Sequence, residues 1–149
     1  RTTPLDTRGA IASLGVLGYE LDISKLTEEE KDKIKKQITN YKQIDNIVLQ
    51  GDLYRLSNPF TSDYFCVMCV SADKTSAYIV GERLRSSVSI QNTDLKLVGL
   101  NENINYRIEE LDIVTSGKAL MNAGIPYPRL YECESWIWHM YACTAKGSE

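Results

Sequence analysis

The sequence predicts a mainly β protein with an α/β segment at its N-terminus. One observation is a strand-like run, residues 14–22, which a charged amphipathic helix follows at once. Another is a change at residue 52, after which short β-branched and aromatic runs alternate with turn signals, as in an antiparallel sandwich or barrel. The composition, 149 residues with 43% hydrophobic and 25% charged, fits one globular domain, or a small domain joined to part of another.

Two helices are expected in the N-terminal part. Pro4 stands where the first turn of a short helix over residues 4–13 would begin. Thr27, with Glu30 three positions later, has the spacing of a capping box and marks the start of a longer helix, for which Gly51 supplies a stop signal. The apolar stripe of this helix comprises Ile34, Ile38, Tyr41 and then Ile44 or Val48.

The remainder of the chain is expected to be antiparallel β-structure. The loop 71–76, "SADKTS", lies between two good strands and predicts a hairpin. Residues 115–130 hold two glycines and two prolines and predict a crossing loop with a short helical turn. The strand-like runs are 52–56, 63–71, 76–84, 95–100, 105–111 and 135–144.

The charge balance argues against nucleic acid and an anionic membrane as partners. The net charge is −3 and the pI is near 5.3, whereas both partners favour a basic surface. No apolar run approaches the ~20 residues of a membrane-spanning helix. The lysines of the long helix fall largely off its apolar stripe, so we expect a solvated face rather than an anion-binding patch; they are Lys31, Lys33, Lys35 and Lys36.

The two ends of the chain carry further signals. The start, "RTTPLDTRGA", has no apolar core of the kind found in a signal peptide, and it lacks an initiator Met. We therefore expect the sequence to begin inside a longer protein. The polar tail 145–149, "AKGSE", is expected to be frayed.

Four cysteines, Cys66, Cys69, Cys133 and Cys143, are expected to be buried free thiols. Cys66 and Cys69 could form half of a zinc site that His139 completes with Cys133 and Cys143, or a disulfide could form. However, "YFCVMCV" reads as a strand, and strand residues three apart point to opposite faces, whereas zinc knuckles need a tight turn. Reduced thiols favour a cytoplasmic setting.

The last strand carries the only histidine and both tryptophans. Alternation places Trp136, Trp138 and Met140 on one face, and Ile137, His139 and Tyr141 on the other. Nucleophilic catalysis of the Ser–His–Asp or Cys–His type would pass through His139. No activating motif surrounds the nearby Cys133 or Cys143, so we expect a packed or surface-facing histidine. The aromatics fit either sheet packing, which we favour, or stacking on sugars.

Glu20 and Asp22 are the candidate binding residues. They end the run 14–22, and side chains at the carboxyl ends of parallel strands face the ligand crevice of α/β folds. That placement holds only if the neighbouring strands exist. Glycine-rich phosphate loops are absent, and no cofactor or metal is expected.

Several motifs resemble the α-galactosidases of glycoside hydrolase family 36. Thr-Pro-Leu, Thr-Arg-Gly, Gly-Tyr-Glu-Leu-Asp, a Glu/Lys-rich helix and Gly-Asp-Leu-Tyr-Arg-Leu follow one another as in that family. Near the end, "SGKALMNAGIPYPRL" resembles the family's Leu-Met-Asn-Ala-Gly stretch, and "ESWIWHMYA" its final strand. The main motifs occupy residues 3–5, 7–9, 18–22 and 51–56.

The resemblance implies that residues 1–50 are the terminal βα segment of a (β/α)₈ catalytic barrel. Residues 51–149 would then be a C-terminal antiparallel β-sandwich domain. The implied activity is retaining hydrolysis of terminal α-galactosides such as melibiose or raffinose, in a homo-oligomer, commonly a tetramer. The family's two catalytic aspartates lie in Lys-Trp-Asp and Ser-Asp motifs, and no catalytic residue is carried over to this sequence. One departure is the stretch 116–119, where family members usually have acidic residues after the glycine.

Two hypotheses follow. In one, the chain is a structural part of an α-galactosidase and is inactive alone. In the other, it is a separate carbohydrate-binding β-sandwich with an exposed aromatic row formed by Trp136 and Trp138. A corollary of the first is that strand 14–22, without its barrel neighbours, is displaced or pairs with another chain, or that its helix packs on the β-domain.

Overall fold

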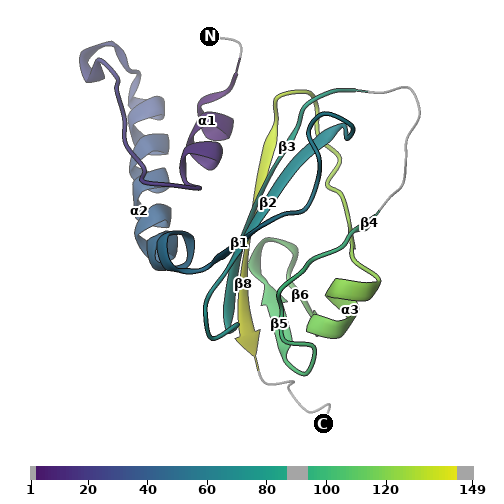
Figure 1. Cartoon of the computed structure of the whole chain (residues 1–149). Coiled ribbons are helices and arrows are strands. Elements are labelled where there is room, and N and C mark those ends of the chain that lie inside the picture. The colour runs from purple at the N-terminus through teal and green to yellow at the C-terminus, as the bar shows by residue number, and fades with distance from the viewer. Residues whose placement is uncertain (1–2, 87–93, 144–149) are drawn as a thin grey trace.

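The computed structural model describes residues 3–86 and 94–143, which form three layers built around one antiparallel sheet (Figure 1). The main sheet has six strands in the order β1-β2-β3-β8-β5-β6, and all of its pairings are antiparallel. The fold class predicted from the sequence, mainly antiparallel β with an N-terminal helical segment, is confirmed. The strands of this sheet are β1 (Asp52–Arg55), β2 (Tyr64–Val70), β3 (Ser76–Arg83), β5 (Asn105–Ile108), β6 (Ile113–Ser116) and β8 (Ser135–Cys143).

Two helices cover one face of this sheet. They are α1 (Leu5–Ala12) and α2 (Glu28–Gln50), and the short 3-10 turn η1 (Ile23–Lys25) lies between them. Both halves of the expected capping box form at the start of α2, and Gly51 caps its end. The apolar stripe of α2 turns towards the sheet, where Ile44 and Ile47 are buried. Neither α2 nor any shorter helix of the described part has an apolar window that could cross a bilayer.

The strand predicted over residues 14–22 does not form. This segment has an irregular, partly extended path that leads from α1 to η1, and α2 packs on the main sheet. A parallel strand needs a neighbouring strand for its backbone hydrogen bonds, and none of the described strands pairs with these residues. The corollary that the helix packs on the β-domain is therefore confirmed.

The hairpin predicted at "SADKTS" joins β2 to β3. The amide of Lys74 donates to the carbonyl of Ser71, and Lys74 itself has a positive φ of 59°. The Asp73 carboxylate accepts hydrogen bonds from the Ser71 and Thr75 hydroxyls and from the Thr75 amide. These bonds hold the pKa of Asp73 down at about 2, so the loop is a local network centred on one carboxylate.

The second face of the main sheet is covered by a small layer. Its elements are β4 (Asp94–Leu95), α3 (Gly117–Asn122) and β7 (Ile125–Pro126), and β4 pairs with β7 in a two-stranded sheet. The expected helical turn within 115–130 is thus confirmed, whereas the strand expected over 95–100 is limited to two residues. The 3-10 turn η2 (Glu109–Leu111) separates β5 from β6. The predicted frayed tail 145–149 lies outside the described residues.

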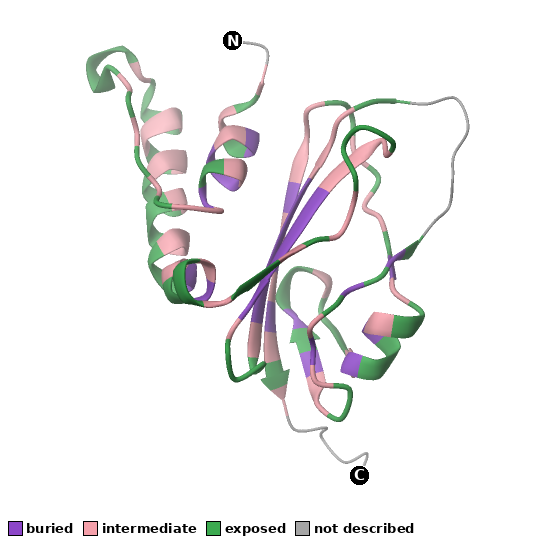
Figure 2. Ribbon diagram, in the orientation of Figure 1, coloured by how far each residue is buried: buried purple, intermediate pink, exposed green. Residues whose placement is uncertain are grey.

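The main sheet separates two hydrophobic cores (Figure 2). Cys66 and Met68 of β2 face the core under the small layer, while Cys69 of the same strand faces the helices. In β8, Trp136, Trp138 and Met140 face the first core, whereas Ile137 packs against the second, as the alternation predicted. The sheet is therefore buried on both faces where the two layers overlap.

Candidate functional site

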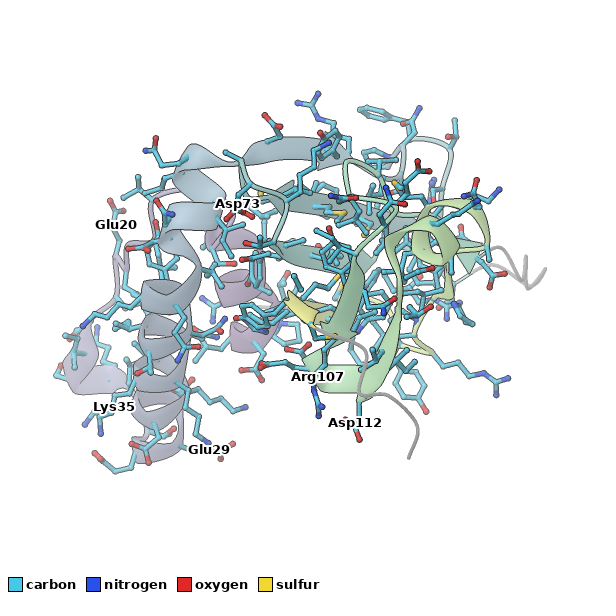
Figure 3. All side chains as sticks on the ribbon, turned by 90° about the horizontal axis from the view of Figure 1, so that it is seen from below. Glu20, Glu29, Lys35, Asp73, Arg107 and Asp112 are labelled. Carbon is cyan, nitrogen blue, oxygen red and sulfur yellow. The ribbon has the colours of Figure 1, made fainter. Side chains whose placement is uncertain are left out.

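The two residues proposed from the sequence lie apart from the sheet. Glu20 is exposed, and Figure 3 shows it on the side of the helical layer that is turned away from the sheet. The Asp22 carboxylate accepts hydrogen bonds from the amide of Ser24 at 3.1 Å and from its hydroxyl at 2.6 Å, and it lies 3.2 Å from the Lys25 ammonium. These contacts lower the pKa of Asp22, so it is a charged cap of η1.

The segment that carries these residues is tied to α2 by two tyrosines. The Tyr19 hydroxyl donates to the Gln37 side-chain oxygen at 2.6 Å, and the Tyr41 hydroxyl donates to the carbonyl of Gly15 at 2.8 Å. The Gln37 amide in turn donates to the carbonyl of Leu5 at 3.2 Å. Glu20 and Asp22 are thus attached to the helical layer through Tyr19.

A buried polar connection joins the helical layer to the sheet. The Ser13 hydroxyl, at the end of α1, donates to the carbonyl of Ala10 at 2.6 Å. Its only proton is used there, so the Tyr78 hydroxyl, 2.8 Å from the Ser13 oxygen, is the donor in their contact. Burial raises the pKa of Tyr78 to about 12, which keeps this donor protonated. In the first turn of the same helix, the Thr7 hydroxyl donates to the carbonyl of Cys133 at 2.7 Å.

His139 forms an ion-pair geometry with Glu110 of η2. The Nδ1 atom lies 2.5 Å from one carboxylate oxygen, and the His139 amide donates to the other at 2.8 Å. The Nε2 atom is buried and has no hydrogen-bond partner among the described residues. The imidazole also lies against Tyr78, with ring centroids 5.2 Å apart. His139 is therefore packed, as expected, and it fastens η2 to β8.

The exposed aromatic row expected from Trp136 and Trp138 is not found. Their side chains are 8% and 3% exposed, because the small layer covers them. Tyr64 and Tyr127 stack on each other beside Trp136, with centroids 4.4 Å apart, and the Arg83 guanidinium lies 5.6 Å from the centre of the Tyr64 ring. The tryptophans thus build a core and offer no platform to a sugar ring.

The cysteines are free thiols. Cys66 and Cys69 are buried on opposite faces of β2, while Cys133 and Cys143 are half-buried. Burial raises the pKa of Cys66 to about 12 and raises that of Cys69 as well, which suppresses the reactive thiolate. Among the described residues there is no group of three or more His, Cys, Asp or Glu side chains arranged to hold a metal.

Two hollows lie on the surface of the described part. The larger, about 660 Å³, lies along the β1–β2 loop, and its lining from Arg55 to Phe60 plus Phe65 contains no acidic residue. The smaller, about 220 Å³, lies between the helices and the sheet and has one acid in its walls, Asp6. Neither hollow offers the two facing carboxyl groups that retaining glycoside hydrolysis needs.

Two sequence features that concern the expected family stand in the β-domain. A Ser-Asp dipeptide occurs at Ser62–Asp63, where it leads into β2 and the carbonyl of Asp63 accepts the amide of Leu84. The stretch 116–119 begins α3: the Ser116 hydroxyl caps the helix by accepting the Ala119 amide, and Gly117 is buried close to the carbonyl of Asn101. In this structure the Ser62–Asp63 dipeptide takes part in backbone hydrogen bonding next to β2, and the stretch 116–119 forms the start of α3.

Two protein-family models match the chain. Residues 1–51, which include the whole helical layer, match the model described as melibiase. Residues 64–140, over half of the chain, match the model described as the glycosyl hydrolase family 36 C-terminal domain. These matches place the chain in the class of the glycoside hydrolases. Within that class, the chain belongs to glycosyl hydrolase family 36 and corresponds to its C-terminal part.

Individual relatives agree with this assignment. Alpha-galactosidase 1 of Pediococcus pentosaceus is 37% identical over 145 residues, which are 97% of this chain and 20% of that protein. Alpha-galactosidase AgaA of Geobacillus stearothermophilus is 39% identical over 143 residues, 95% of this chain and 20% of the relative. The chain therefore spans a fifth of the length of these relatives, and the resemblance seen in the sequence is confirmed.

Solved structures share the fold. The family 36 α-galactosidase AgaA in complex with raffinose matches with a TM-score of 0.90 at 39% identity, over 96% of this chain and 20% of that chain. The α-galactosidase from Lactobacillus brevis matches with a TM-score of 0.90 at 30% identity, over all of this chain and 21% of that chain. The helical layer and the sheet thus occur together in larger family members.

Proposed function

We propose that this chain is the C-terminal part of an α-galactosidase that hydrolyses terminal α-galactosyl residues, as in melibiose and raffinose, with retention at the anomeric carbon. Its own role is structural. It would complete the catalytic barrel with residues 1–50 and hold that end of the barrel against the β-domain formed by residues 51–149. The names of the relatives and the two family models support the activity of the parent.

The observation that carries the structural role is the core shared by the helices and the sheet. Ala10 of α1 and Ile44 and Ile47 of α2 pack with Cys69, Tyr78 and Val80 of the main sheet. The first three lie in the segment matching melibiase, and the last three in the segment matching the C-terminal domain. A barrel helix with this contact is fixed to the β-domain because separating them would expose buried apolar surface on both.

The hollows support the proposal that catalysis belongs to the upstream part. A retaining glycosidase holds two carboxyl groups about 5–5.5 Å apart. The linings described above contain at most one acid each. In the intact enzyme the α-galactoside would bind in the barrel.

We also propose that the enzyme is cytoplasmic, which its free thiols support.

An assay on a chromogenic α-galactoside tests the proposal directly. We expect turnover by the protein that includes the upstream barrel and none by the 149-residue chain alone. Turnover by the chain alone would overturn the structural role. Absence of turnover by the longer protein on any α-galactoside would overturn the activity.

Glu20 and Asp22 remain our candidates for the substrate side of the intact barrel. If they line the crevice, Glu20→Gln and Asp22→Asn in the longer protein should raise KM for the α-galactoside. Asp32→Asn is the matched control, because Asp32 is an exposed acid on α2 that pairs only with the neighbouring Lys35 among the described residues. Unchanged kinetics in both candidate variants would remove these residues from the site.

A further inference from the structure

The main sheet ends in two edge strands with different surfaces. These are β1 on one side and β6 on the other, and among the described strands β6 pairs only with β5 (Figure 1). The side chains of Ile113 and Val114 on β6 are 42% and 50% exposed. In the described part of the chain, the outer edge of β6 thus combines apolar side chains with backbone groups that pair with no other strand.

The edge at β1 carries the usual protection against pairing, whereas the edge at β6 does not. Natural edge strands are commonly blocked by charged side chains, by proline or by a bulge. Strand β1 has Asp52 at one end and Arg55 at the other. Strand β6 reads Ile-Val-Thr-Ser, without a charge or a proline, and its register with β5 is continuous over all four residues. An exposed apolar strand of this kind is a template for another strand.

The chain on either side of β6 carries charges of opposite sign. Glu109 and Asp112 precede the strand, and the exposed Lys118 follows it in the first turn of α3. Asp112 has a left-handed backbone with φ of 51°, and its carboxylate lies 2.5 Å from the Arg107 guanidinium, an ion pair that fixes the turn into the strand. The two residues are labelled in Figure 3. In an antiparallel arrangement of two such strands, the acidic end of each would lie beside the basic end of the other.

We propose that β6 pairs antiparallel with β6 of a second copy of this chain, so that one sheet continues through both copies about a two-fold axis. Such an interface is self-complementary: the same strand edge supplies both sides, and every contact between two residues occurs twice, once on each side of the two-fold axis. Val114 and Ile113 would be covered in the contact, and Lys118 of each copy would approach Glu109 of the other. This inference does not depend on the proposed function, since it concerns association and not hydrolysis.

Sedimentation of the 149-residue chain over a range of concentrations tests the pairing. We expect a reversible change from the 16.8 kDa monomer to twice that mass as concentration rises. Val114→Lys should raise the dissociation constant at least about tenfold, because like charges would face each other across the two-fold axis. Leu53→Lys on β1 is the matched control, since Leu53 is 51% exposed on the opposite edge and should leave association unchanged.

A charge exchange gives a second test with exposed positions only. Glu109→Lys and Lys118→Glu should each weaken the dimer, and the double variant should restore it. In addition, amide hydrogen exchange at residues 113–116 should slow as the dimer forms. A chain that stays monomeric at every concentration overturns the proposal, as does a dimer that Leu53→Lys dissociates and Val114→Lys does not. Either result leaves the activity of the longer protein untouched.

Discussion

Gly81 lies in β3 directly beneath the indole of Trp136. A Cβ atom at Gly81 would lie 2.1 Å from ring atoms of Trp136, far inside contact distance. We expect Gly81→Ala to lower the free energy of unfolding by about 1–3 kcal/mol, because the Trp136 ring is packed against Tyr64, Tyr127 and Trp138 and would have to shift. Urea denaturation followed by tryptophan fluorescence would measure the change.

Gly18→Ala is the control for this substitution. No atom lies within 4 Å of a Cβ placed at Gly18, so its effect should be close to zero. Equal effects at the two glycines would show that the Trp136 ring does not restrict Gly81.

The pair His139–Glu110 predicts a dependence of stability on pH. Burial by itself raises the pKa of Glu110, but hydrogen bonds from the imidazole and the amide of His139 outweigh it and leave that pKa lowered. A lowered folded-state pKa means that the stabilisation is complete above the unfolded value and is lost as pH falls through the folded value. Glu110→Gln should therefore cost about 1 kcal/mol at pH 7, a modest figure because the carboxylate is partly exposed.

The difference between Glu110→Gln and the unchanged protein should shrink as pH falls through the lowered folded-state pKa of Glu110, because the protonated Glu110 carboxyl is then neutral like the glutamine amide. Chemical denaturation at pH 7 and at acidic pH would show it. Glu102→Gln, which alters an exposed carboxylate away from His139, should give a small and pH-independent change. A constant difference at all pH values would contradict the assigned role of the pair.

Individual residues also show how far the sequence alone could lead. Strand alternation placed Trp136, Trp138 and His139 on their correct faces, because the period of two is a local property. It could not tell that a separate layer covers the tryptophans. It also gave no sign that Glu110, 29 positions earlier, would reach His139.

Helix α2 is the element whose sequence signals were most complete. Thr27 accepts the amide of Glu30 at 3.2 Å, and the Glu30 carboxylate accepts the amide of Thr27 at 2.9 Å. We expect Thr27→Ala to cost about 1 kcal/mol and to speed amide exchange in the first turn of α2, while Thr39→Ala in the middle of the helix should leave the first turn unaffected. Protection of residues 28–31 unchanged in Thr27→Ala would contradict the cap.

Strands were predicted less evenly than helices. The strands β2, β3 and β8 matched their expected ranges to within a residue or two at each end, because each is largely apolar and alternates regularly, and β1 also matched closely. The strand expected over 105–111 ends at Ile108, where η2 begins. The short β6 was not predicted, and β7 lies in the stretch expected to be a crossing loop, since two to four residues carry too little pattern. The strand predicted over residues 14–22 was wrong for a different reason. The segment has a strand's composition, but no described strand lies beside it to accept its backbone hydrogen bonds.

The molecule as a whole should unfold in one step. The helices and the sheet share a core through Ile44 and Tyr78, whereas the side chains of both tryptophans, on β8, pack in the core on the other face of the sheet. Helical circular dichroism and tryptophan fluorescence should therefore report coincident transitions. Two separated transitions would contradict the shared core on which the structural role depends.

Truncation at the shared core tests the same coupling. Ile44 is fully buried, so Ile44→Ala should lower the unfolding free energy by about 2–5 kcal/mol and shift both signals together. Ile38→Ala is the control, because Ile38 is 37% exposed on the same helix and should cost much less.

The two thiols of β2 can report on the two faces of the sheet separately. Cys66 lies under the small layer and Cys69 under the helices, three positions apart on one strand and on opposite sides of it. A thiol reagent can reach each only after its own cover lifts, and mass spectrometry separates the two adducts. The alkylation rate of Cys66 therefore reports how often the small layer opens, and that of Cys69 how often the helical layer opens, without a substitution in the protein.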